Sequence, residues 1–217
     1  EAKSAALIAG LRRLLDECAA AQAEAVAAWH VADPGDLPEP GDLPALVLAQ
    51  HQANYRLWHV EDDARAVDVG PEVIARCKRD IDRLNQRRND LIEQVDACLV
   101  SLLLPLLPAR LPERINTETL GSALDRLSIL ALKIFHMDEQ TRRKDVGEEH
   151  RAACRDKAEV LLRQREDLLA AAQDLVDEYG RGEKRPVVYR QFKMYNDPRL
   201  NPRLYGAARA AGPAAED

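Results

Sequence analysis

Apolar residues recur at steps of three and four along most of the chain, the spacing that places them on one face of an α-helix. The clearest run begins at Pro71, where a proline suits the first helical turn because its missing N–H costs nothing there. Its apolar positions are Ile74, Cys77, Ile81, Leu84, Leu91, Val95, Cys98 and Leu102. Only Arg88 interrupts this face, so we predict a long helix with a coiled-coil-like seam.

The same spacing, together with helix end signals, predicts four more helices. They are expected over Ser4–His30, from Pro44 to about Val67, from near Thr119, and from about Glu148 to Tyr179 with Gly180 as the C-terminal glycine. Ser122 and Asp125 are spaced as a capping box for the helix near Thr119. We therefore predict an all-α bundle of about five long helices, with the helices from Pro71 and Thr119 at its centre.

One domain is predicted over residues 1–205, followed by a disordered tail over 206–217. Within this domain, residues 181–205 form a C-terminal strap of basic and aromatic residues, expected to lie extended and to pack on the bundle through its aromatic rings. The long apolar faces exceed what one chain covers, so we expect a homodimer.

The charge distribution argues against nucleic acid as a partner. The net charge is −6, but residues 181–217 carry 8 basic and 4 acidic groups, which leaves 23 and 33 in the rest of the chain. An acidic body of about −10 repels phosphates from most of its surface. No apolar stretch reaches the length of a membrane span. The four cysteines show no CxxC spacing, which indicates free thiols and a cytoplasmic protein.

Polar residues on helix faces that should pack inward are the main functional signal. We take ten residues as candidates for ligand binding: His51, Asn54, Trp58, His59, Asp62, Asn85, Arg88, Asn89, Asp125 and His136. Because a buried charge needs a partner, Arg88 is expected to pair with Asp62 or Asp125. Two interpretations stay open. These residues form a structural network that fixes helix register, or they line a pocket for a phosphate- or sugar-bearing small molecule.

Two pairs at helical spacing, His59 with Asp62 and His136 with Glu139, could each reach one metal ion from one helix face. Di-iron bundles use the order Glu-x-x-His together with inward glutamates from two other helices, which this chain lacks. Glu93 and Asp96 lack a companion ExxE motif, and Glu93 is expected to be solvated. We therefore predict no metal ligands, name no cofactor, and find no motif of a catalytic nucleophile.

Four stretches of the chain resemble one bacterial family, catalogued as domain-of-unknown-function family 4254. They are HQANYRLWHVEDDAR, IDRLNQRRNDLIEQVD, NTETLGSALDRLSILALKIFHM and YRQFKMYNDPRLNPRLYG. The resemblance covers roughly residues 5–205 and implies a single-domain soluble protein, often encoded near genes for cell-surface polysaccharides. It implies no activity and no catalytic residues.

Three functions follow as hypotheses. The first is a polar site between helices that binds a phosphate- or sugar-bearing molecule. The second is a non-catalytic interaction or scaffold protein of a cell-surface polysaccharide pathway. The third is a metal-dependent hydrolase of nucleotides or nucleotide sugars.

Overall fold

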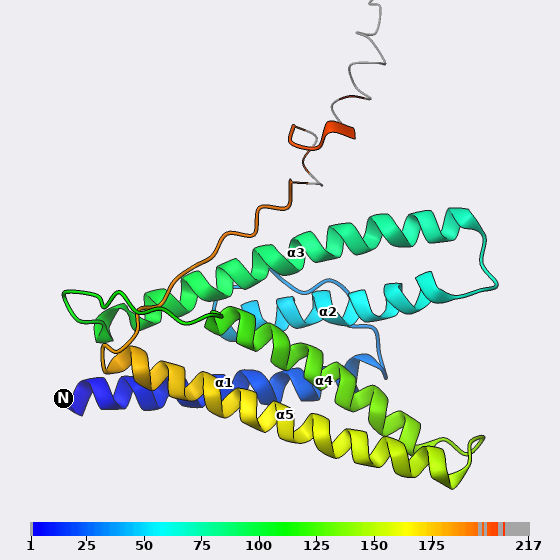
Figure 1. The fold of residues 1–217 in the computed structure, drawn as a ribbon, viewed down its shortest axis with the longest axis horizontal. Coiled ribbons are helices and arrows are strands. Elements are labelled where there is room, and N and C mark those ends of the chain that lie inside the picture. Colours follow the sequence, from blue (N-terminus) through cyan, green and yellow to red (C-terminus); the bar gives the residue numbers. More distant parts are fainter. Residues whose placement is uncertain (1, 195–196, 198, 204–205, 207–217) are drawn as a thin grey trace, which may run out of the picture.

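The structure is a computed structural model that describes residues 2–194, 197, 199–203 and 206. Its elements are α1 (Ala2–Trp29), α2 (Leu43–Arg65), α3 (Pro71–Leu103), the short 3-10 helix η1 (Leu104–Leu106), α4 (Leu120–Arg142) and α5 (Glu148–Gly180). No strand occurs among the described residues. The predicted all-α bundle of five long helices is confirmed (Figure 1).

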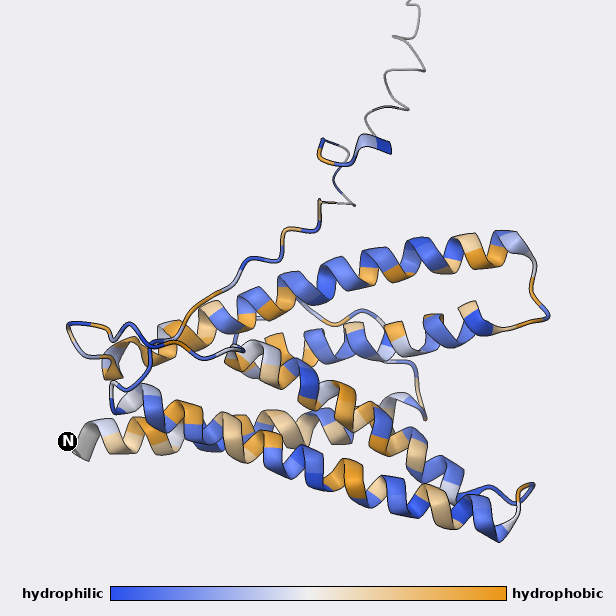
Figure 2. Ribbon diagram, viewed as in Figure 1, coloured by the Kyte–Doolittle hydropathy of each residue, from blue (hydrophilic) through white to orange (hydrophobic). Residues whose placement is uncertain are grey.

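The helices form two antiparallel hairpins, α2 with α3 and α4 with α5, which diverge from left to right in Figure 1. Helix α4 packs against all four other long helices and is central, as predicted. The prediction that α3 is also central is wrong, because α3 packs mainly on α2 and lies at the edge of the bundle. Its first turns have only α2 beside them, so Ile74 stays 36% exposed, and Figure 2 shows a largely hydrophilic α3.

The main core lies where all five helices come together. Its most deeply buried members include Leu15, Val47, Leu99, Leu103, Leu124, Leu127 and Val176. Burying each such side chain stabilises the fold by about 1.5–3 kcal/mol. Gly121, at the start of α4, lets α3 approach closely, since a Cβ there would lie 2.7 Å from Asp96 Oδ1.

The helix ends follow their sequence signals with two corrections. Asp42 caps α2, and its side chain accepts a hydrogen bond from the Ala45 N–H at 2.9 Å. Thr119, not Ser122, caps α4 and accepts from the Ser122 N–H at 3.0 Å. Asp125 is therefore not part of a capping box. Helix α5 includes Gly180, and the glycine with the left-handed backbone is Gly182 at φ 68°.

The described part of the C-terminal strap contacts the bundle through polar groups. The Arg185 N–H donates to Arg114 O at 2.9 Å. Glu93 is not freely solvated as expected, because its carboxylate accepts from Arg190 Nη1 at 2.8 Å and from the Gln191 N–H at 2.6 Å. The expected packing of aromatic rings is not seen at Phe192, which is 83% exposed. The predicted contacts of Tyr195 and Tyr205, and most of the predicted disordered tail, lie outside the described residues.

No helix in the described part of the chain is long and apolar enough to cross a membrane.

Candidate functional site

Asp125 on α4 is the centre of a buried polar network. Its carboxylate accepts from Arg88 Nε at 2.8 Å and from Arg88 Nη2, so α3 and α4 are joined by a bidentate ion pair. The side chains of Arg88 and Asp125 are 25% and 6% exposed. Two amides of α2 complete the set: Asn54 Nδ2 donates at 3.0 Å, and Gln50 Nε2 also donates. The pairing of Arg88 with Asp125 confirms one of the two predicted partners.

The network continues to His51, which is fully buried on α2. His51 Nδ1 lies 2.7 Å from Ser128 Oγ, and this hydroxyl also accepts from Asn54 Nδ2 at 2.9 Å. Burial lowers the pKa of His51 to about 4, so the ring is neutral near neutral pH. The Asp125 carboxylate has four donors, which come from side chains of α2 and α3.

Five of the ten predicted residues line one surface pocket beside this network: Asn54, Trp58, Asp62, Asn85 and Arg88. The pocket has a volume of about 380 Å³ and opens between α2, α3 and α4. Two predictions fare differently. Asp62 was expected to face inward, but it is exposed at the pocket rim, because α4 diverges from α2 toward this end of the helix (Figure 1). Asn89 is half-buried on α3 and does not line this pocket.

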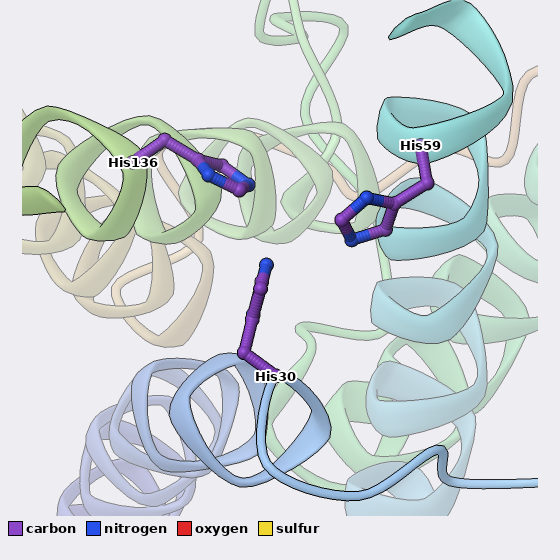
Figure 3. A group of neighbouring side chains, drawn as sticks. All are labelled: His30, His59 and His136. Carbon is purple, nitrogen blue, oxygen red and sulfur yellow. The ribbon is translucent and has the colours of Figure 1, made fainter. Parts of the chain in front are cut away.

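The other two predicted residues, His59 on α2 and His136 on α4, meet a third histidine. His30 directly follows α1, and one ring nitrogen from each of the three lies within 4.8 Å of the others. In Figure 3 the three rings point toward a common centre. The Nε2 atom of each ring is buried and has no hydrogen-bond partner among the described residues. We call this group the tri-histidine cluster.

Hydrogen bonds to the Nδ1 atom orient two of these rings. His30 Nδ1 lies 2.6 Å from Val26 O, and His136 Nδ1 lies 2.8 Å from Glu139 Oε2. A carbonyl or a carboxylate oxygen only accepts, so Nδ1 of each ring carries the hydrogen. In the neutral ring Nε2 then presents its lone pair. This is the arrangement in which an outer carboxylate or carbonyl orients a metal-ligating histidine.

Aromatic rings enclose the cluster. Trp58 stacks on His136 with centroids 4.6 Å apart and planes at 9°, and Phe135 stacks on His30 at 4.1 Å. Tyr55 contacts the His59 ring edge-on at 4.6 Å. Burial lowers the pKa of His59, and the neighbouring His30 and His136 lower it further. The surroundings therefore oppose protonation of His59.

Sequence reasoning missed His30, Gln50 and Ser128 and gave Glu139 a different role. Helical spacing pairs His59 and His136 with carboxylates on their own helices, but the partner that they share, His30, follows a third helix. Glu139 contacts Nδ1 of His136 and contributes no ligand atom to the cluster. His30 and His59 are far apart in sequence, so no local spacing could have joined them.

The comparisons with known proteins place these residues in a family. The sequence model of the family described as "Protein of unknown function (DUF4254)" matches residues 44–188, two thirds of the chain. Searches of curated proteins and of solved structures return no match. The matched segment contains all ten residues predicted from the sequence and two of the three clustered histidines, whereas His30 precedes it. The chain therefore belongs to the DUF4254 family of proteins of unknown function.

Proposed function

We propose that this protein binds one divalent transition-metal ion through His30, His59 and His136. The three imidazole donors favour Zn²⁺. The observation that supports this most strongly is the convergence of three buried ring nitrogens that have no hydrogen-bond partner in the described part of the chain. A buried polar atom left without a hydrogen bond costs about 1–3 kcal/mol, and such groups are rare in folded proteins. One cation would satisfy all three at once.

The lone pairs explain why the centre needs an electrophile. When their rings are neutral, His30 and His136 each direct the lone pair of Nε2 inward, because Nδ1 donates outward. His59 faces them and has a lowered pKa, so a proton is a poor bridge between the rings. A metal ion accepts electron pairs from neutral imidazoles and requires no proton.

The donor set selects the class of ion. Imidazole suits Zn²⁺, Cu²⁺ and Ni²⁺, whereas Mg²⁺ and Ca²⁺ prefer oxygen ligands. Among the described residues no carboxylate or thiol joins the three histidines as a ligand. Tetrahedral Zn–N bonds of about 2.0–2.1 Å place ligand nitrogens roughly 3.4 Å apart, so binding requires the rings to close from separations of up to 4.8 Å.

Three protein ligands leave the fourth position of a tetrahedral ion to water or a substrate, which is the pattern of catalytic rather than structural zinc. Three neutral ligands keep the full charge of the ion, and such a centre lowers the pKa of bound water to about 7. His59 also lines a second surface pocket, with Asp33, Tyr55 and Arg56 among its walls, so one of the three rings borders open space. Hydrolysis is the reaction class that this arrangement supports, in line with the third hypothesis.

Titration calorimetry with Zn²⁺, and visible spectroscopy with Co²⁺, test the proposal. One ion per chain is expected, with a Co²⁺ spectrum of tetrahedral intensity. Zinc at a hundredfold its dissociation constant should stabilise the fold by about 2.7 kcal/mol, which raises the melting temperature by about 5–11 °C.

Single-residue variants test whether these three histidines bind the ion. His30→Gln, His59→Gln and His136→Gln should each abolish tight binding, and Glu139→Gln should weaken it by roughly ten- to a hundredfold. His150→Gln is the matched control, because His150 is exposed on α5 and lies outside the cluster. The proposal fails if no saturable binding is found, or if His150→Gln weakens binding as much as the cluster variants do.

A further inference from the structure

The pocket beside Arg88 contains several polar groups that the fold itself does not use. The side chain of Asn85 makes no hydrogen bond within the described part of the chain, and neither does the indole N–H of Trp58. Arg88 uses Nε and Nη2 for Asp125 and leaves Nη1 unpaired among the described residues. Asn54 donates twice through Nδ2, so its Oδ1 is left as an acceptor. The carboxylate of Asp62 stands at the rim without an ion pair in the described chain.

These groups offer donors and acceptors in nearly equal number. Amide, indole and guanidinium N–H groups donate, while the Asn54 carbonyl and the Asp62 carboxylate accept. A ligand that satisfies both kinds at neighbouring positions carries groups that donate and accept together, and hydroxyl groups do this. The remaining walls are apolar, since Leu57, Ile129 and Leu132 complete the pocket with the Trp58 ring.

The charges of the pocket decide between the two ligand classes considered from the sequence. Arg88 is neutralised by Asp125. Arg65 is neutralised by Glu61, with 2.9 Å between Arg65 Nη2 and Glu61 Oε2. Asp62 is left over, so the pocket carries an excess negative charge and repels a phosphate group. A neutral ligand is favoured.

We infer that this pocket binds a neutral polyhydroxylated ligand, namely a single pyranose ring. Its hydroxyl groups match the mixed donors and acceptors, and its apolar C–H faces match Trp58 and the aliphatic wall. Stacking on His136 holds the Trp58 ring in place before any ligand arrives. Because the pocket walls contain none of the three clustered histidines, this inference goes beyond the metal site and does not depend on it.

Saturation-transfer NMR on the full chain tests the inference, with methyl glucoside, methyl galactoside, N-acetylglucosamine and inorganic phosphate as probes. At least one monosaccharide should bind saturably in the millimolar range, and phosphate should neither bind nor compete. Binding should be the same after metal is removed with a chelator, which separates this result from the proposed function. In a Trp29→Phe variant Trp58 is the only tryptophan, so its fluorescence should respond to the same sugar.

A pair of asparagines on α3 provides the matched variants. Asn85→Ala should raise the dissociation constant by about tenfold, the effect of losing the hydrogen bonds of one amide. Asn89→Ala, one turn further along and outside the pocket, should leave it unchanged. Both replacements favour a helix, so folding is preserved. The inference is overturned if no monosaccharide in the set binds, if phosphate binds in preference, or if the two variants behave alike.

Discussion

Breaking the ion pair between Arg88 and Asp125 should strongly lower the stability of the fold. The sequence alone left open whether Arg88 pairs with Asp62 or with Asp125. Arg88→Met keeps the length and apolar character of the side chain but removes the guanidinium. Asp125, with a side chain only 6% exposed, then keeps only the two neutral amide donors of Gln50 and Asn54. Stranding a buried charge in this way costs roughly 3–5 kcal/mol. For a chain of this size the melting temperature should fall by about 6–20 °C.

Urea unfolding followed by circular dichroism measures this change in free energy. The matched control is Arg87→Met, which removes the same group from the preceding, exposed position of α3. Its effect should lie within about 0.5 kcal/mol of zero.

A second variant separates the ion pair from simple loss of packing. Adding Asp125→Asn to Arg88→Met removes the stranded charge and should recover part of the lost stability, a coupling that a double-mutant cycle measures. If Arg88→Met unfolds at the same urea concentration as Arg87→Met, the network does not hold the bundle together and the reasoning is refuted.

Two further predictions concern the ends of the helices. Burial raises the pKa of Asp96 to about 6 from a usual 3.8, so its contribution to stability is complete below 3.8 and is lost as the pH rises through about 6. Asp96→Asn keeps the acceptor for the Gly121 N–H. Above pH 6 the free energy of unfolding of this variant should therefore exceed that of the wild type by up to about 3 kcal/mol. Urea unfolding at several pH values measures this difference, and equal pH profiles for the two proteins would contradict it. Deleting residues 181–217 should lower the melting temperature, because the contacts of Arg185 with Arg114 and of Arg190 with Glu93 are lost, whereas deleting 207–217 should not. An unchanged melting temperature after truncation at Gly180 would show that the C-terminal strap does not stabilise the bundle.

Most of the fold could be predicted because its signals are local. Apolar spacing and the prolines at positions 44 and 71 define helices whose bounds match the structure closely. The place of α3 could not be predicted in this way. A seam shows that a helix packs, but it does not show how much of that seam its neighbours cover.

The candidate site shows the same limit. The rule that a buried charge needs a partner identified Arg88 and narrowed its choice to Asp62 or Asp125, but only the packing of α4 against α3 decides for Asp125. His59 and His136 were among the predicted candidates. His30 was not, because a single residue after the end of a helix has no periodic pattern to reveal its direction.

X-ray absorption at the zinc edge of the zinc-loaded protein tests the tri-histidine metal site most directly. We predict three imidazole nitrogens at about 2.0–2.1 Å and one exchangeable oxygen ligand. In His30→Gln the imidazole scattering should fall or the zinc should be absent, while His150→Gln should leave the spectrum unchanged. A zinc shell of oxygen atoms alone, a sulfur ligand at about 2.3 Å, or a spectrum unaffected by His30→Gln would contradict the proposal.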